Sequence, residues 1–326
     1  WSFITDDWKS LEAELSGTPV SMGYSPAFVL FPATGRVFIV VEYVYPNSPA
    51  NAAGLKRGDI ILTIDGQSMD TGNYYDLYSL PNYTAGLGTY ANNTITLSGK
   101  TVTMTAASFS ADPLIFDTIF TMEGKKIGYM VYTDFIAGDN NQYLATLDEV
   151  FDQYKSGGVS DVIVDLRYNP GGEIDASGHL ASAIAPYSVV SSSSVFVTFV
   201  YNKTLQSYFE KREGAESENL IYRFPANSHN MDLSRVYFLT TYYSASASEL
   251  LIVGLRPYMD VVVVGEPTYG KYTGLWVIYD TDEPPAHNWA ILPIVTKFAN
   301  SVGYTDFKDG LEPDIAVEEN LLQAKP

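Results

Sequence analysis

The chain has 326 residues, of which 46% are hydrophobic and 17% charged, which is typical of a folded globular protein with room for two domains. Its formal net charge of −19 disfavours contact with a phosphate backbone, so we expect no nucleic-acid partner. The sequence has no cysteine and only three scattered histidines, so disulfides, thiolate nucleophiles and metal sites are not expected.

The first predicted element is a short helix in "ITDDWKSLEAELSG", residues 4–17. Its apolar residues recur at helical spacing, Asp6 and Asp7 can cap or favour the first turn, and Gly17 can end the helix. We treat residues 1–17 as an N-terminal helical segment.

Residues 18–112 are rich in short β-type runs separated by Gly, Pro and Asn turns. Within them, "NSPANAAGLKRGDIILTIDGQSM" covers residues 47–69. Ser48 can start a short helix, Gly54 can end it, and "IILTIDG" reads as a strand. The local signals alone do not distinguish an ordinary helix-turn-hairpin from a specific functional motif, and both are equally open at this point.

From residue 113 to 326, apolar strands alternate with helical stretches, the clearest helix being residues 140–158. The predicted strands are "KIGYMVY", "VSDVIVDL", "RVYFLTT" and "MDVVVVGE". This alternation indicates an α/β core with a mostly buried sheet beside the β-rich part, so the fold class is α+β or α/β.

One of these strands runs into a glycine turn in "VIVDLRYNPGGEI", residues 162–174. Gly171 and Gly172 permit backbone conformations closed to other residues and could leave N–H groups free for an oxyanion. A tight strand-to-helix turn that needs glycine for steric reasons is the alternative.

The run "YYSASASELL", residues 242–251, lies between a predicted strand and a predicted buried helix that ends near Pro257. A serine at this junction is well placed as a nucleophile, because a helix N-terminus favours developing negative charge. With no cysteine and scattered histidines, its base would have to be a desolvated, neutral lysine. Lys271, at the end of "VVVVGEPTYGK", is a plausible choice, although most lysines are surface charges.

These stretches together resemble known families. The motif in residues 47–69 resembles the PDZ domains of bacterial proteases. Behind it, "VDLRYNPGG", "SASASEL", "GEPTYGK" and "DGLEPDI" resemble the S41 serine peptidases, the C-terminal processing or tail-specific proteases. The resemblance covers most of the chain from about residue 20 and implies a crotonase-like catalytic core in residues 113–326.

The resemblance also implies roles for particular residues. Ser246, the middle serine of its motif, would be the nucleophile, and Lys271, 25 positions later, the base. The backbone N–H groups of Ala247 and Gly172 would form the oxyanion hole. The PDZ-like domain, residues 18–112, would bind peptide C-termini by β-augmentation.

For that peptide, residues 22–31 are the candidate loop, chosen by their order along the chain. The residues we expect to contact it are Gly23, Tyr24, Phe28 and Val29.

One departure from the family pattern concerns the lysine. Many members have a glutamine four positions after it, and Leu275 stands there in this chain. Lys271 would then need another orienting group, such as the hydroxyl of Thr273 or Tyr269, or the site is weakened.

Several neighbouring residues are expected to be structural. Ser244 and Ser248 would support the turn. Glu249 would either cap the helix, which is the favoured interpretation, or pair with a cation near the site. The other expectations are that Asp165 and Arg167 fix the glycine turn and that His179 packs a helix or lies at the surface.

The function that follows is a Ser–Lys endopeptidase without metal or organic cofactor, acting on proteins or peptides with free C-termini. Two rivals stay open: a PDZ-containing peptide-binding protein with weakened or lost catalysis, and acyl chemistry on a thioester or small ester. A casein assay on wild type and Ser246→Ala distinguishes the first rival, and thioester hydrolysis the second.

The cellular location is less defined by the sequence. No stretch approaches 18 consecutive apolar residues, so we expect a soluble chain without a membrane-spanning segment. The start at Trp1 and the tyrosine-rich, acidic composition without cysteine favour an exported bacterial protein of the cell envelope, periplasmic or extracellular, although a cytosolic protein could have the same composition. A preceding lipid anchor or dimerisation element stays open, as does the oligomeric state.

Overall fold

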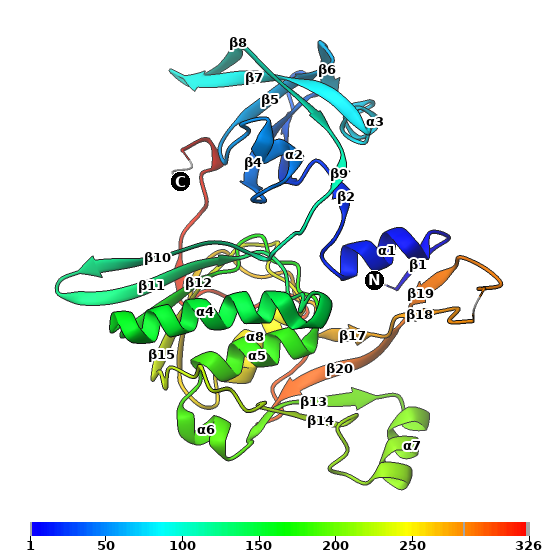
Figure 1. Cartoon of the computed structure of the whole chain (residues 1–326), viewed down its shortest axis with the longest axis vertical. Helices are drawn as coiled ribbons and strands as arrows, with labels where there is room; N and C mark the ends of the chain where they lie inside the picture. Colours follow the sequence, from blue (N-terminus) through cyan, green and yellow to red (C-terminus); the bar gives the residue numbers. More distant parts are fainter. Residues whose placement is uncertain (1, 283, 324–326) are drawn as a thin grey trace. The chain divides into compact units, whose positions relative to one another are not determined.

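A computed structural model describes residues 2–282 and 284–323, which form two compact units (Figure 1). The larger unit contains residues 2–16 and 113–319, and the smaller unit contains residues 17–112 and 320–323. The N-terminal segment therefore packs within the larger unit, and the residues after Glu319 pack within the smaller one.

The smaller unit is a β-rich domain with two short helices. Its sheet is antiparallel, in the order β3-β4-β6-β5-β7-β8, with β2 and β9 paired separately. The elements are β2 (Val20–Ser21), β3 (Tyr24–Phe31), β4 (Arg36–Val44), α2 (Pro49–Ala52), β5 (Ile60–Ile64), β6 (Gln67–Asp70), α3 (Tyr74–Tyr78), β7 (Asn82–Ala91), β8 (Thr94–Thr105), β9 (Ala107–Ser108) and the 3₁₀ turn η2 (Leu321–Gln323).

The helix expected inside the PDZ-like motif is present as α2. Ser48 caps it by accepting a hydrogen bond from the backbone N–H of Asn51 at 3.2 Å. Gly54 follows with φ of +84°, a conformation that favours glycine and ends the helix. The strand expected after it is β5.

The larger unit is a mixed α/β domain. Its elements are β1 (Phe3–Thr5), α1 (Trp8–Leu15), β10 (Leu114–Met122), β11 (Lys125–Tyr132), η1 (Asp139–Asn141), α4 (Gln142–Gly157), β12 (Asp161–Asp165), α5 (Ile174–Ile184), α6 (Tyr187–Ser191), β13 (Val195–Tyr201), α7 (Lys203–Glu213), β14 (Ile221–Arg223), β15 (Arg235–Thr240), α8 (Ala247–Leu255), β16 (Asp260–Gly265), β17 (Thr273–Leu275), β18 (Ile278–Tyr279), β19 (Ala290–Leu292), β20 (Ile294–Asn300) and β21 (Ile315–Ala316).

The main sheet of the larger unit has the order β10-β11-β12-β15-β16-β21. All its neighbours are parallel except the hairpin of β10 and β11. The chain steps along the sheet in one direction, from β11 to β16, with α4, α5 and α8 in the crossovers. Right-handed crossovers in one direction place successive helices on the same face, and α5 contacts both α4 and α8 there (Figure 1).

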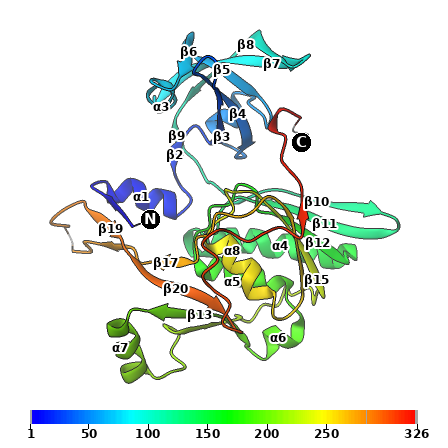
Figure 2. The same ribbon diagram turned by 180° about the vertical axis from the view of Figure 1, so that it is seen from behind.

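A second sheet packs against α8 in the order β14-β13-β20-β17 (Figure 2). Gly254 of α8 lets Phe196 of β13 approach closely, because a Cβ at Gly254 would lie 2.2 Å from the Phe196 ring. The apolar residues of α8 are buried between the two sheets.

The N-terminal segment differs from the expectation at its start. The expected helix is α1, capped by Asp7, but residues 3–5 form β1, which pairs with β19. Trp8 also stacks on Tyr279 of β18, with ring centroids 3.5 Å apart. Local sequence does not reveal these partners because they lie more than 270 residues away along the chain.

Candidate functional site

Three turns of the larger unit meet at one edge of its main sheet. They follow the parallel neighbours β12, β15 and β16, and they cover residues 166–172, 241–246 and 266–271. The carboxyl ends of parallel strands share an edge, so the three expected motifs of the sequence converge there.

Ser246 lies at the N-cap of α8, in the turn after β15. Its backbone has φ of +59° and ψ of −111°, which is rare and strained for a residue with a side chain. It is partly exposed, whereas every residue of α8 is buried. A sharp strand-to-helix turn of this kind presents a hydroxyl at the edge of a sheet.

The two flanking serines hold the turn. Ser244 donates its hydroxyl hydrogen to the carbonyl of Leu166 at 2.7 Å, and Ser248 donates to that of Asn169 at 3.0 Å. Both side chains are fully buried. Their expected structural role is therefore confirmed, since they connect the serine turn to the turn that follows β12.

The glycine turn after β12 lies directly against Ser246. A Cβ at Gly171, where φ is +107°, would lie 2.6 Å from the Cβ of Ser246 and 2.8 Å from the nitrogen of Ala247. At Gly172, where φ is +138°, it would lie 2.2 Å from the Phe135 carbonyl oxygen. Only glycine fits both positions.

Two backbone N–H groups near Ser246 lack an acceptor among the residues that the structure describes. Among the residues that the structure describes, neither the N–H of Ala247 nor that of Gly172 donates a hydrogen bond. Unpaired N–H groups at a helix start can bind an anion. Ser246 differs, because its own N–H is donated to Glu249 at 2.9 Å.

Glu249 connects the serine turn to the lysine turn. Its Oε2 accepts hydrogen bonds from the backbone N–H groups of Ser246, at 2.9 Å, and Lys271, at 2.8 Å. Its Oε1 accepts from the Thr268 hydroxyl at 2.5 Å and from the Gly270 N–H at 2.7 Å. The expected capping role holds, and the carboxylate also binds the turn after β16.

The Lys271 residue is partly buried. Burial lowers the pKa of Lys271 below its ordinary value, and the negative charge of Glu249 opposes this effect. Within the described part of the chain, the Lys271 Nζ has no hydrogen-bond or ion-pair partner. This environment favours a neutral amine more than an exposed site would.

Two hydroxyl groups, those of Thr273 and Tyr269, were expected as alternatives to the glutamine for orienting Lys271. Leu275 lies in β17, and the buried Thr273 hydroxyl has no partner among the described residues. Within the described residues, no hydrogen bond joins Lys271 Nζ to the hydroxyl of Thr273 or Tyr269.

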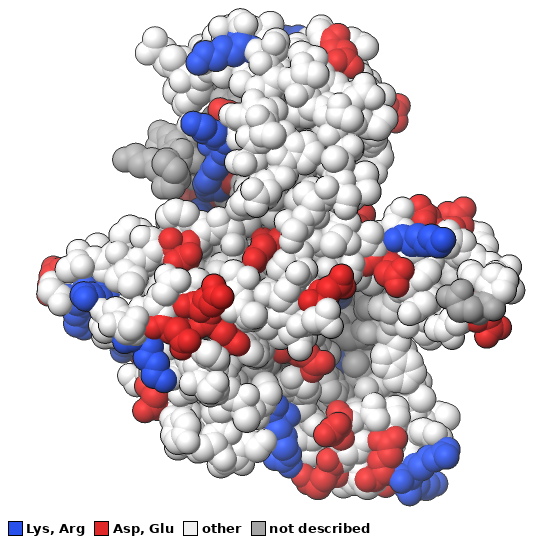
Figure 3. Space-filling view, viewed as in Figure 1, with Lys and Arg blue, Asp and Glu red and all other residues white. Residues whose placement is uncertain are grey.

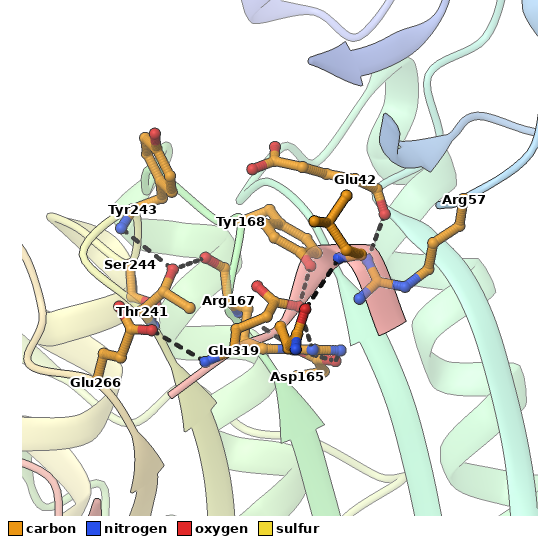
Figure 4. Close-up of polar contacts among 12 residues, drawn as sticks. Glu42, Arg57, Asp165, Arg167, Tyr168, Thr241, Tyr243, Ser244, Glu266 and Glu319 are labelled. Carbon is orange, nitrogen blue, oxygen red and sulfur yellow. Dashed lines mark hydrogen bonds and ion pairs between the residues drawn. The ribbon is translucent and has the colours of Figure 1, made fainter. Parts of the chain in front are cut away.

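Arg167 and Asp165 brace the start of the glycine turn, as expected (Figure 4). The guanidinium donates to both carboxylate oxygens of Asp165, with Nη2 2.6 Å from Oδ2. It also pairs with Glu319, 2.5 Å away, and the Tyr168 hydroxyl donates to the same Glu319 oxygen. Thr241 donates its hydroxyl hydrogen to the Arg167 carbonyl, which links the turns after β12 and β15.

His179 lies away from this chemistry on α5. It contacts the Asp148 carboxylate of α4 at 2.7 Å, so it joins two helices. Among the described residues, no three His, Asp or Glu side chains are grouped so that they could hold a metal ion. None of the described helices combines the length and apolar character that crossing a bilayer requires.

The candidate peptide site of the smaller unit lies along β3, which is an edge strand of its sheet. Phe28 projects toward α3, with its ring centroid 5.1 Å from that of Tyr74. Tyr24, by contrast, is 6% exposed and its hydroxyl bonds that of Tyr83, so its side chain belongs to the core. Val29 packs against a small apolar cluster on the other side of the sheet.

Gly23 precedes the edge strand and has φ of +77°. A Cβ there would lie 2.2 Å from the Cβ of Ser48, the cap of α2. The residues expected to contact a peptide thus divide between the core and the open edge.

A sequence model of peptidase family S41 matches residues 126–317, more than half of the chain. The chain belongs to peptidase family S41. A PDZ domain model matches residues 40–80 of the smaller unit.

Several S41 relatives align with most of the chain. A carboxyl-terminal-processing protease of Picosynechococcus is 27% identical over 270 residues, covering 80% of this chain and 56% of that protein. One of Synechocystis is 26% identical over 319 residues, covering 95% and 64%. A solved structure from Bacteroides fragilis, assigned as an S41 protease, superposes with a TM-score of 0.78 at 26% identity, covering 98% of this chain and 79% of that one.

These alignments cover only part of each curated relative. This S41 chain spans between about half and two thirds of the curated relatives' length. The mixed α/β fold with a PDZ domain is that of the family.

The contacts of Glu249 with the backbone of the turn after β16 go beyond the two roles expected for it, capping and pairing with a cation. The spacing from Ser246 signals a capping carboxylate, but the contacts with Thr268, Gly270 and Lys271 arise only when β16 brings its turn alongside α8. A carboxylate inside an otherwise apolar helix, "SELLIVGL", was the available signal.

Proposed function

We propose that this S41 chain is a serine endopeptidase in which Ser246 is the nucleophile and Lys271 the general base. The observation that carries the proposal is the shared carboxylate oxygen of Glu249, which lies 2.9 Å from the Ser246 nitrogen and 2.8 Å from the Lys271 nitrogen. It fixes the two backbones beside each other, next to the N–H groups of Ala247 and Gly172, which are suited to an oxyanion.

The reaction would proceed by acyl transfer. Ser246 Oγ attacks the scissile carbonyl carbon while neutral Lys271 Nζ takes its proton. The oxyanion accepts hydrogen bonds from the N–H groups of Ala247 and Gly172. Lys271 then protonates the leaving amine, and water, deprotonated by the same lysine, hydrolyses the acyl-enzyme.

Substrate choice is assigned to the PDZ domain. The open edge of β3 can take an extended peptide as an added strand, and the partly exposed Phe28 ring beside α3 can contact an apolar side chain of that peptide. We propose that the substrates are proteins recognised by their free C-termini, in the cell envelope. A crotonase-like catalytic core is part of the same proposal.

Loss of catalysis with retained peptide binding is the second candidate. It is favoured by one observation, that Leu275 occupies the place of an orienting glutamine and Lys271 Nζ has no partner among the described side chains. A chain of this kind would bind C-terminal peptides and leave them uncut.

The test compares casein hydrolysis by wild type, Ser246→Ala and Lys271→Ala from about pH 6 to 10. We expect each variant to lose activity by roughly a thousandfold or more. Wild-type activity should rise with pH as Lys271 loses its proton, with a midpoint below about 10.4, the ordinary lysine pKa, because burial lowers this pKa.

Matched controls are Ser191→Ala and Lys203→Ala, which change exposed residues of the same types on α6 and α7. Both should retain wild-type activity. Equal hydrolysis by wild type and Ser246→Ala would contradict the proposal, and tight binding of uncut peptides would then favour the second candidate.

A further inference from the structure

Glu249 is a fully buried carboxylate in the first turn of α8. Buried carboxylates are costly unless they are paired or hydrogen-bonded. This one accepts four hydrogen bonds, two at each oxygen, from Ser246, Thr268, Gly270 and Lys271. Three of the donors are backbone N–H groups, which cannot accept a hydrogen bond from a protonated carboxyl group.

This set of donors matches an ionised carboxylate. Burial raises the pKa of Glu249, and the hydrogen bonds from Thr268 and from the three backbone groups act against that rise. The Thr268 hydroxyl itself accepts from the Leu311 N–H at 2.7 Å, so its own hydrogen is directed to Glu249. A protonated Glu249 would lose at least one of these four bonds.

We propose that Glu249 is a positioning residue that fixes the separation of Ser246 and Lys271 and sets the pH range in which Lys271 acts as a base. The inference rests on the proposed Ser–Lys function and names a third residue for it. Glu249 acts through the two backbones and through its charge, without touching the substrate.

The shared oxygen explains the positioning. Oε2 receives the Ser246 N–H and the Lys271 N–H, so movement of either turn breaks a charge-assisted hydrogen bond. The same contact removes the Ser246 N–H from the set of oxyanion donors. Ala247, one residue later, keeps its N–H unpaired among the described residues.

The charge of Glu249 explains the pH range. The Glu249 carboxylate accepts a hydrogen bond from the Lys271 backbone N–H at 2.8 Å, and its negative charge acts to raise the Lys271 pKa. Arg167, on the turn after β12, is paired with Asp165 and Glu319. Other titratable groups on the adjoining turns are the tyrosines Tyr168, Tyr242, Tyr243 and Tyr269 and the carboxylate of Glu266, and the segment that packs against Gly270 carries Lys308 and Asp309.

The sign of the effect follows from this arrangement. A negative Glu249 stabilises the protonated form of Lys271, so its removal lowers the lysine pKa. The neutral amine then becomes available at a lower pH.

The first experiment measures kcat/KM against pH for wild type and Glu249→Gln. The glutamine has only one oxygen, so it leaves two donors facing an NH₂ group. We expect the maximal kcat/KM to fall about 10-fold, because the dyad is less well held. The acidic limb should move to lower pH by roughly one unit, because the charge is gone.

Glu266→Gln is the matched control, because it removes a carboxylate from the same β16 turn without a contact to Ser246 or Lys271. Its acidic limb should coincide with that of wild type. A Glu249→Gln profile with an unmoved acidic limb would overturn the proposal.

A second variant and a second measurement provide further ways to refute the proposal. Glu249→Asp retains the charge and shortens the side chain, so its maximal kcat/KM should fall while its acidic limb stays in place. Full activity of Glu249→Asp would contradict the positioning role. This outcome remains decisive even if circular dichroism shows that Glu249→Gln does not fold.

Competitive labelling of amines with acetic anhydride, read by peptide mass spectrometry, gives the Lys271 pKa without turnover. In a Ser246→Ala background, Glu249→Gln should lower it by roughly one unit. If wild type shows no Ser246-dependent hydrolysis, the proposed function fails, and an unchanged lysine pKa would separately refute the charge effect.

Discussion

At the scale of single residues, the site depends on backbone conformations that most side chains exclude. Ser246 has a positive φ although it carries a side chain, and Gly171 and Gly172 each lie where a Cβ would overlap a neighbour. Strain of this kind is retained where the surrounding structure fixes it, here through Glu249, Ser244 and Ser248.

Gly172→Ala tests the glycine turn. Its Cβ would lie 2.2 Å from the Phe135 carbonyl oxygen, so the turn must move and the Gly172 N–H with it. We expect the free energy of unfolding to fall by about 1–3 kcal/mol and kcat/KM by more than about 100-fold. Urea denaturation and casein hydrolysis measure the two effects.

Gly214→Ala is its control, since that glycine also has a positive φ, +91°, but a Cβ there would meet nothing within 4 Å. It carries the same type of backbone strain away from the site, so its activity should be that of wild type. A Gly172→Ala protein with normal activity would show that the turn does not contribute an oxyanion donor.

At the scale of elements, the edge strand β3 and helix α3 form the part of the PDZ domain most suited to a peptide. Phe28 lies 39% exposed on β3, with Tyr74 and Tyr78 of α3 beside its ring. An aromatic side chain in this position can be covered by an apolar side chain of the ligand.

Phe28→Ala should therefore weaken binding of C-terminal peptides by about 10-fold, because roughly 1–2 kcal/mol of apolar contact is lost. Fluorescence anisotropy with labelled peptides measures the affinity. Phe31→Ala is the matched control, because Phe31 lies on the same strand and is 42% exposed but packs on Phe38 instead of α3. Equal affinities of both variants would place the peptide elsewhere.

The elements differ in how well the sequence predicts them. The parallel strands β12, β15 and β16 and helix α8 follow from continuous apolar runs bounded by Gly, Pro and Ser, and each was confirmed within a few residues. The second sheet and the pairing of β1 with β19 were not predicted. Four of these six strands have only three residues, and all of them pair with distant segments, so no local period reveals them.

The candidate site shows the same division. Motifs at the strand ends located Ser246, Lys271 and the glycine turn, because parallel strands bring their carboxyl ends together. The four contacts of Glu249 depend on how α8 lies against the turn after β16, which a one-dimensional pattern does not contain.

At the scale of the whole molecule, acidity is the dominant surface property. The face drawn in Figure 3 carries Asp and Glu side chains dispersed over it, with only separate Lys and Arg groups among them. With a net charge of −19, mutual repulsion opposes the compact state.

Salt should therefore stabilise the protein. Raising NaCl from about 20 to about 500 mM screens the repulsion, and we expect the melting temperature to rise by roughly 2–4 °C. Scanning calorimetry measures this shift. Near about pH 5.5, closer to the isoelectric point of 4.4, the shift should shrink, and a salt effect independent of pH would argue against charge repulsion as its cause.

Each unit is completed by a terminal segment of the chain. β1 and α1 extend the larger unit through β19 and the Trp8–Tyr279 stack. Leu321 and Leu322 pack on the apolar cluster of the smaller unit that includes Phe38. The backbone thus passes between the units at residues 16–17, 112–113 and 319–320.

This interleaving affects any dissection of the protein. A fragment confined to residues 18–112 would expose the side of its sheet that Leu321 and Leu322 cover. A fragment beginning at residue 113 would lack β1, the strand that pairs with β19. Isolated halves would each need their missing strand or turn restored, for instance by circular permutation, before their separate activities could be compared.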